Sequence, residues 1–197
     1  MKNILIAFVC LLTAKAALAQ KDSLAFDERN KYIYYQTVEA AGLAKDTLYK
    51  RALYFMNKAY PKSKLKLASA DEPQGVLIAV GNFVITKRSL LSNSLGGETN
   101  YVLRVEVKNA KYRYWFTDFV FTPYKRDRFG NEVLVSGTDV AIENGKDKLD
   151  KKDLAVYMDK ILQNSRQVGG VLKGYMLKIS NLSKVEKEIK KISTKEW

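Results

Sequence analysis

The side chains most often used in catalysis are nearly absent from this chain. Its 197 residues include no histidine and one cysteine, Cys10, which lies among the first nineteen residues. Imidazole and thiolate are the usual general bases, nucleophiles and zinc ligands of proteins. Removal of residues 1–19 would exclude Ser-His-Asp triads, Cys-His dyads and His/Cys zinc sites from the mature chain. Carboxylates are then the remaining candidates for acid–base chemistry.

The carboxylate clusters do not form a convincing site. Asp71 and Glu72 lie in a predicted turn before Pro73. A second group recurs every third residue among lysines, without the glycine and closing glutamate of a calcium loop: Asp147, Asp150 and Asp153. We therefore predict no enzymatic activity, no cofactor and no metal site.

Asp118 is the most interesting single carboxylate. Strand alternation places it on the same side as Tyr114 and Phe116, which are predicted to face the core. Two interpretations follow. Asp118 is either a buried carboxylate available for proton transfer or a strand-end residue bonded to a tyrosine hydroxyl such as that of Tyr101.

The best candidate binding residues come from a predicted β-hairpin with its turn at Asn109–Ala110. This turn places Glu106 opposite Arg113 and Arg104 opposite Trp115, on the face away from the core. The result is an ion pair beside a guanidinium–indole contact. The group either staples the hairpin or forms a surface that stacks a sugar ring or holds a peptide.

A second candidate surface is basic and aromatic. It consists of Tyr124, Lys125, Arg126 and Arg128, in a segment predicted to be a loop over 123–131. Such a loop either contacts phosphate groups or is simply solvated.

The net charge is consistent with an anionic partner. The formal charge is +13. Removal of residues 1–19, which include Lys2 and Lys15, leaves 32 of the 34 basic residues against 21 acidic ones, a net charge of +11. The candidate partners are a protein, a glycan or another anionic molecule. The basic residues are spread along the chain among acids, which favours a solvated coat over a dedicated patch. No nucleic acid partner is expected for an exported protein.

The first nineteen residues resemble a secretory signal peptide. Lys2 supplies the positive start, Ile4 to Leu12 the apolar segment, and Ala17 to Ala19 the small-residue cleavage site before Gln20. We predict cleavage after Ala19 and a periplasmic or secreted product. The alternative is an uncleaved leader that acts as an anchor.

Hydrophobic periodicity predicts one α+β domain over residues 31–180, after a flexible segment 20–30. The predicted strands are 31–39, 64–70, 76–86, 100–108 and 112–121, with a short edge strand over 132–140. The predicted helices are 44–60 and 152–179, with a loop over 87–98 and a linker over 145–152. Both helices should cover one face of an antiparallel sheet and leave the other face open.

A basic amphipathic helix is predicted over 181–197. Its part from Lys184 to Trp197 would either lie on an anionic membrane surface or pack on the sheet or on a second protomer.

Two blocks resemble the domain-of-unknown-function 4468 family, small secreted domains from bacteria of the Bacteroides group. Gly42 to Ala52 (GLAKDTLYKRA) is similar to that family's helix start, and Tyr101 to Phe119 is similar to its hairpin. The resemblance covers 31–121. Ala44 departs from it by replacing a usual Ser N-cap, and Tyr54-Phe55 by replacing a usual Trp.

The resemblance implies a fold similar to one repeat of the TATA-box-binding protein, with the order strand, helix, four strands, helix. It implies no activity, and the fold analogy does not imply DNA binding.

Three functions remain open. The first is an exported, non-enzymatic binding module that uses the open sheet face. The second is a carrier with a cavity for an apolar ligand between the sheet and the long helix. The third is a carboxylate hydrolase, which needs two carboxyl groups about 5–9 Å apart in a cleft.

Overall fold

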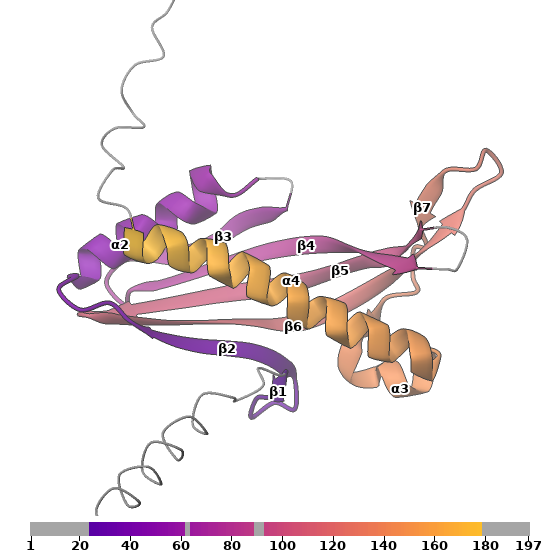
Figure 1. The fold of residues 1–197 in the computed structure, drawn as a ribbon, viewed down its shortest axis with the longest axis horizontal. Helices are drawn as coiled ribbons and strands as arrows, with labels where there is room; N and C mark the ends of the chain where they lie inside the picture. The colour runs from indigo at the N-terminus through magenta and orange to yellow at the C-terminus, as the bar shows by residue number, and fades with distance from the viewer. Residues whose placement is uncertain (1–23, 62–63, 89–92, 179–197) are drawn as a thin grey trace, which may run out of the picture.

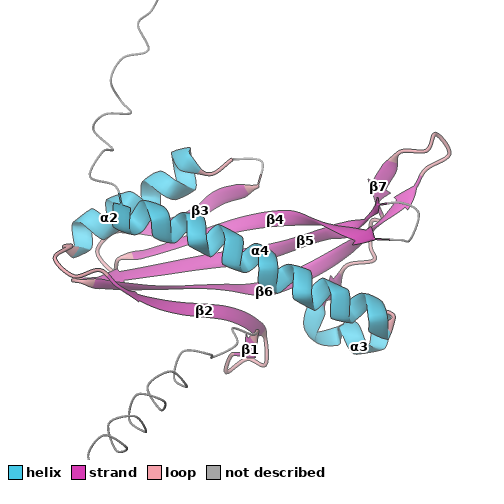
Figure 2. Cartoon of the chain, viewed as in Figure 1, coloured by secondary structure: helices cyan, strands magenta, loops and turns pink. Residues whose placement is uncertain are grey.

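The structure is a computed structural model of the 197-residue chain, and it describes residues 24–61, 64–88 and 93–178. A curved antiparallel sheet forms one layer, and two helices lie across one of its faces (Figure 1 and Figure 2). The predicted order of strand, helix, four strands and helix is confirmed. The fold class is α+β, as predicted.

Six strands form the main path of the sheet in the order β1-β2-β6-β5-β4-β3. Their bounds are β1 (Ala25–Phe26), β2 (Tyr32–Glu39), β3 (Leu65–Asp71), β4 (Val76–Arg88), β5 (Asn93–Lys108) and β6 (Lys111–Arg126). Two short strands, β7 (Glu132–Leu134) and β8 (Val140–Ala141), pair with β6 off this path. Every pairing between the described strands is antiparallel.

The helical layer consists of α2 (Lys45–Tyr54), which continues as the π-helical turn η2 (Phe55–Ala59), and the long α4 (Lys151–Lys178). Two short elements precede α4: the 3₁₀ turn η3 (Ile142–Asn144) and α3 (Gly145–Lys148). The apolar stripe of α4 is buried against the sheet at Tyr157, Ile161, Val168, Leu172 and Met176. Among the described residues, no helix combines the length and apolar character that a bilayer span requires.

Gly169 explains how α4 comes so close to the sheet. A Cβ atom at this position would lie 2.5 Å from the hydroxyl of Tyr114, which is closer than real contacts allow. The helix runs through Gly169 and Gly170 without a break. Of the two roles that the glycine pair suggests, a kink or a close approach, the structure supports the close approach of a neighbouring strand.

The start of α2 is capped from a distant part of the chain. Its N-cap residue, Ala44, has no side chain that can accept a hydrogen bond. Instead, the Asn109 side-chain carbonyl accepts the backbone N–H of Lys45 at 2.9 Å. The β5–β6 turn also donates from the N–H of Ala110 to the carbonyl of Leu43. The turn thus replaces the usual Ser N-cap.

The core lies between the helices and one side of each strand. Tyr101, Leu103 and Val105 of β5 and Tyr112, Tyr114 and Phe116 of β6 alternate with residues on the other face, and all six are buried. Phe55 and Met56 of η2 close one end of this layer, and Phe121 stacks on Tyr157 of α4 at 4.2 Å between ring centroids.

Two predicted loops are wrong in part, because strands extend into them. The predicted loop over 87–98 belongs largely to strands, since β4 extends to Arg88 and β5 begins at Asn93. Gly97 permits this, because a Cβ there would lie 2.5 Å from the Phe121 ring. The predicted loop over 123–131 likewise loses residues 123–126 to β6, where residues 124–126 pair with β7.

The predicted edge strand over 132–140 is limited to β7 and the first residue of β8, and the predicted linker over 145–152 contains α3 and the start of α4.

The segment before β2 is partly folded. Within the segment 20–30, predicted to be flexible, residues 24–30 contain β1 and a turn in which Asp27 accepts the backbone N–H groups of Arg29 and Lys31. The leader 1–19, residues 20–23 and the predicted helix 181–197 lie outside the described residues.

Candidate functional site

The face of the sheet away from the helices carries a row of large side chains. Antiparallel register places Tyr35 of β2 beside Trp115 of β6, Trp115 beside Arg104 of β5, and Arg104 beside Ile78 of β4. Side chains at such paired positions share one face and contact each other. The row therefore crosses four strands at the middle of the open face.

A second row lies next to it and is mostly apolar. Val102 of β5 is paired with Thr117 of β6 and with Val80 of β4, and Ile33 follows on β2. Tyr35 and Val80 are 43% and 45% exposed. We call the apolar members of the two rows the apolar band: Ile33, Tyr35, Ile78, Val80, Val102 and Trp115.

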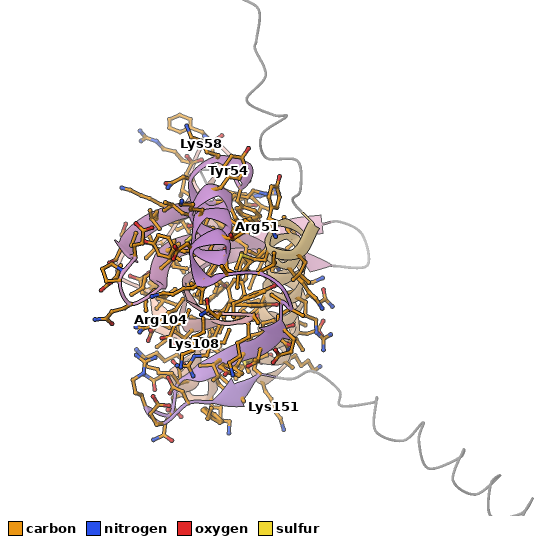
Figure 3. All side chains as sticks on the ribbon, turned by 90° about the vertical axis from the view of Figure 1, so that its left-hand side faces the viewer. Arg51, Tyr54, Lys58, Arg104, Lys108 and Lys151 are labelled. Atoms are coloured by element: carbon orange, nitrogen blue, oxygen red, sulfur yellow. The ribbon has the colours of Figure 1, made fainter. Side chains whose placement is uncertain are left out.

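The curvature of the sheet makes this face concave. The hollow has a volume of about 560 Å³, and residues of the β1–β2 turn form part of its rim. Arg29 of that turn donates to the Thr117 hydroxyl at 3.2 Å and lies 3.5 Å from the Asp118 carboxylate. Figure 3 shows Arg104 and Lys108 on the side of the sheet opposite α4.

Glu106 organises the charged part of the face. Its two oxygens accept from Arg104 Nε at 2.9 Å and from Arg113 Nε at 2.7 Å. Burial alone would raise the pKa of Glu106, but the hydrogen bonds from Arg113 and Arg104 outweigh burial and hold it below its ordinary value. The carboxylate is therefore ionised at neutral pH and fixes both guanidinium groups.

Trp115 is flanked by these same arginines. The guanidinium carbons of Arg104 and Arg113 lie 5.5 and 5.4 Å from the indole centroid, within the range of cation–π contacts. The Tyr35 ring lies 6.1 Å away on the β2 side. The predicted ion pair and the predicted guanidinium–indole contact are confirmed, while their role in binding stays a prediction.

Both interpretations of Asp118 are wrong. A β-bulge between Asn100 and Val102 inserts Asp118 as an extra residue with φ of 53°, in the left-handed region. The bulge turns Asp118 toward the rim of the open face, where it meets Arg29. The strand then resumes with Phe119 and Phe121 in the core. Strict alternation through the bulge misplaced this carboxylate.

Residues 34–122 match a family described as a domain of unknown function, DUF4468, with a TBP-like fold. The chain is thus similar to the DUF4468 family over this region. The family resemblance noted from the helix start and the hairpin is thereby confirmed.

Solved structures support the same fold. The chain is similar to the crystal structure of a DUF4468 family protein from Bacteroides ovatus, with a TM-score of 0.59 and 16% identity over 78% of this chain and 90% of that one. It is also similar to a TBP-like protein from Parabacteroides distasonis, with a TM-score of 0.60 and 12% identity over 78% and 96%. At such identities the likeness concerns the fold alone. No curated protein gives a significant match.

The second predicted surface lies in another part of the molecule. Tyr124, Lys125 and Arg126 end β6, about 30 Å from Trp115 at the usual rise per residue. The Tyr124 hydroxyl donates to Glu98 at 3.5 Å, and Arg126 bonds Glu132 at 3.0 Å.

Beyond the end of β6, Arg128 lies over the exposed Phe129 ring at 4.8 Å. These contacts hold the second surface on the β6–β7 hairpin. Because that hairpin is distant from Trp115, the two surfaces do not form one site.

Three other carboxylates, Asp71, Asp150 and Glu143, have local roles. Asp71 accepts the backbone N–H of Gln74 in a turn, and Asp150 accepts that of Lys152 at the start of α4. Glu143 accepts the N–H of Tyr32. Within residues 24–61, 64–88 and 93–178, no three acidic, histidine or cysteine side chains gather in a way that could hold a metal ion.

Sequence reasoning missed Arg29 and Tyr35. Arg29 was missed because residues 20–30 look too polar to fold. The sequence of the turn could have indicated its position. Asp27 accepts the backbone N–H of Lys31. Asn30 adopts φ of 57°, a conformation that asparagine tolerates better than most residues. Tyr35 could have been found by extending the alternation of β2 to its partner strand.

Proposed function

We propose that this protein is an exported, non-enzymatic interaction module that binds a partner protein on its open sheet face. The observation that carries the proposal is the apolar band, which lies partly exposed on a concave surface and is flanked by arginines bonded to Glu106. Contiguous exposed apolar surface of this kind marks interaction sites on soluble proteins. Tryptophan, tyrosine and arginine are also the side chains most enriched at the centres of protein interfaces.

The charges of the hollow favour a protein over a polyanionic glycan. Three arginines line it, and so do four carboxylates: Asp27, Glu28, Glu106 and Asp118. Arg29 is bonded to Asp27, and Arg104 and Arg113 are bonded to Glu106. A polyanion would therefore have to displace existing ion pairs. The flanking of Trp115 by two arginines also leaves less of the indole face for a sugar ring.

The carrier function has less support. The space between α4 and the sheet holds fully buried rings, including Phe116, Phe119 and Phe121. These packed side chains fill the space that an apolar ligand would have to occupy.

The hydrolase function also has less support. An acid catalyst needs a carboxyl group that keeps its proton near neutral pH. Burial would raise the pKa of Asp27, but hydrogen bonds from the Lys31 backbone and from Arg29 lower it below its ordinary value. The pKa of Glu106 is lowered in the same sense. Asp27 and Glu106, two of the four carboxylates of the hollow, thus favour the ionised form.

Export is the second part of the proposal and rests on the leader sequence. Expression with the full leader in a Gram-negative host should yield a chain that begins at Gln20. Intact-mass measurement of the exported fraction tests this directly. A mass that retains Met1 to Ala19, or a lipid on Cys10, would contradict the export of a soluble product.

Photo-crosslinking in the exporting cell tests the open face. The crosslinking residue p-benzoylphenylalanine is placed at position 80 in the apolar band, and in a matched variant at position 171 on α4. Val80 and Val171 are exposed to similar extents, 45% and 40%. We expect discrete protein adducts from position 80, absent from position 171 and lost when Trp115→Ala is added.

Two results would overturn the partner proposal. One is equal adducts from both positions, because the open face would then have no preference. The other is the absence of adducts together with quenching of Trp115 fluorescence by a heparin hexasaccharide but not by maltohexaose. In that case the ligand is an anionic glycan. The second tryptophan, Trp197, is changed to Phe so that the signal comes from Trp115 alone.

A further inference from the structure

The two outer edges of the sheet differ in how they are protected. At one edge, β3 has a register shift between Leu67 and Ser69 and an exposed lysine, Lys66. Bulges and lysines are the devices by which proteins prevent an edge strand from pairing with another chain. At the other edge, β1 covers only Tyr32 and Ile33 of β2. From Tyr34 to Glu39, β2 has no outer strand partner among the described residues.

This open part of β2 is regular and carries none of the usual protection. Its register with β6 runs without a shift from Tyr34 to Glu39, and the segment contains neither proline nor lysine. The outward backbone groups can be identified. Ala40 directly follows β2, and its N–H donates to the carbonyl of Ala110, which directly precedes β6. Because hydrogen-bonded pairs alternate along antiparallel strands, the even-numbered residues of β2 are the ones that bond to β6. The N–H and C=O groups of Tyr35, Thr37 and Glu39 therefore point outward from the sheet.

Hollows flank this edge on both sides. On the helix side, a hollow of about 490 Å³ lies between β2 and the α4 residues Arg166, Gly170 and Lys173. On the open side, a hollow of about 240 Å³ is lined by Thr37 and Lys111, among others. A strand added to β2 would point alternate side chains into these two hollows.

The charge of the two hollows specifies the occupant. Their linings contain five basic residues and two acidic ones: Lys108, Lys111, Arg113, Arg166 and Lys173 against Glu39 and Glu106. Glu106 is bonded to Arg113, one of these five, and to Arg104, which leaves Glu39 against the other four basic residues. The side chains of an added strand would thus meet an excess of positive charge on both faces.

We propose that the β2 edge from Tyr34 to Glu39 is a docking site for an extended acidic peptide segment of a partner protein, which joins the sheet as an additional antiparallel or parallel strand. Backbone hydrogen bonds to Tyr35, Thr37 and Glu39 supply affinity, and the basic hollows select acidic side chains. The proposal does not depend on the open-face function, because it rests on the backbone of the β2 edge and on the hollows beside it. Tyr35, Glu106 and Arg113 also line the open-face hollow, so the two sites adjoin.

The test is binding of a fluorescein-labelled, end-blocked octapeptide of alternating valine and glutamate, measured by fluorescence anisotropy with the mature chain. A peptide of alternating valine and lysine is the charge control. Thr37→Pro removes an outward N–H without breaking a bond to β6, and proline is tolerated at such edge positions. The matched variant Thr37→Val keeps the N–H. We expect Thr37→Pro to weaken binding about tenfold and Thr37→Val to leave it within about twofold.

A second pair of variants tests the charge. Lys173→Glu reverses a charge at the hollow, and Lys151→Glu reverses one at the far end of α4, where Figure 3 labels it. We expect Lys173→Glu to weaken binding about threefold to tenfold and Lys151→Glu to have no effect. Circular dichroism checks the fold of Thr37→Pro. If that variant unfolds, an octapeptide N-methylated at alternate residues replaces it and should not bind.

Three results would overturn the proposal. The lysine peptide could bind as well as the glutamate peptide. Thr37→Pro, while folded, could leave binding unchanged. Light scattering could show a dimer of the mature chain that Thr37→Pro converts to a monomer, in which case the occupant is the β2 edge of a second copy. Crosslinking from position 80 reports on the open face, and the octapeptide measurement reports on the β2 edge. A failure of one proposal can therefore be distinguished from a failure of the other.

Discussion

Neighbouring residues of β6 belong to two very different surfaces. Phe116 is fully buried beneath the helices, where its ring lies near those of Tyr34, Tyr101 and Tyr114. Trp115 faces the other way and is only half-buried, between two arginines. One strand thus contributes in alternation to a packed, apolar face and to an open face whose charges are paired.

The difference indicates a separation of stability from recognition. The covered face excludes water and gains free energy from apolar burial, which is the dominant favourable contribution to folding. The open face retains exposed aromatic and aliphatic side chains, and its salt bridges are partly solvated, so they add little to folding. Substitutions on the two faces should therefore have effects of different kinds.

The largest expected effect separates Phe116 from Trp115. Phe116→Ala leaves a cavity in the core and should cost about 3–5 kcal/mol of unfolding free energy. Trp115→Ala loses mainly two cation–π contacts and partial burial, and should cost about 1–2 kcal/mol. Denaturant unfolding measures both. Equal losses would break the comparison, because they would place Trp115 among the core residues.

A second pair tests how tightly the covered face is packed. Gly169→Ala would drive a methyl group to 2.5 Å from the Tyr114 hydroxyl and should cost about 1–3 kcal/mol. Gly170 is exposed and has no atom within 4 Å of the added carbon, so Gly170→Ala should stabilise α4 by about 0.4–1 kcal/mol. Thermal unfolding of the two variants gives the comparison. A stabilising Gly169→Ala would show that α4 can move away from the sheet.

The pH dependence of the open face should be small but of definite sign. The pKa of Glu106 is lower in the folded state than its ordinary value of 4.5, so its contribution to stability is present above that value and is lost as the pH falls through the folded-state pKa. Glu106→Gln should therefore be less stable than the parent at pH 7, by up to about 1 kcal/mol, and equal to it in strong acid. Urea unfolding across pH 2–7 measures the difference. A constant gap across that range would mean that ionisation of Glu106 is not involved.

The smallest expected effect concerns Val80. This residue is 45% exposed at the centre of β4, and Val80→Thr keeps a β-branched side chain there. We expect a change of less than about 0.5 kcal/mol in unfolding free energy, as for other surface substitutions. Adduct formation by a crosslinker at the neighbouring position 102 should nevertheless fall. A loss of stability above this range would show that the apolar band supports the fold.

The regular parts of the fold could be predicted from sequence because their periodicity is strong. Alternation on β5 and β6 identified the two faces of the hairpin and placed Glu106 opposite Arg113 and Arg104 opposite Trp115. The stepping of apolar residues on α4 identified its buried stripe. In these elements each residue's neighbours follow directly from its position in the chain.

What could not be predicted depends on deviations from that regularity. The bulge at Asp118 shifts the alternation by one residue, and no local sequence pattern indicates its position. The strand extensions around Gly97 depend on the close approach of Phe121, a residue distant in sequence. The turn that places Arg29 on the open face depends on contacts with Thr117 and Asp118. Such features are set by tertiary contacts, which a single sequence does not display.

The cap that Asn109 provides to α2 has a consequence for the order of folding. The acceptor of the first helical N–H lies 64 residues after Lys45 in the chain, at the tip of the β5–β6 hairpin. A helix of ten residues is marginal on its own, and nucleation of its first turn is the costly step. We therefore expect α2 to gain its full helicity only after the hairpin has formed, so that hydrogen exchange at its first turn reports closure of the hairpin, not local unwinding.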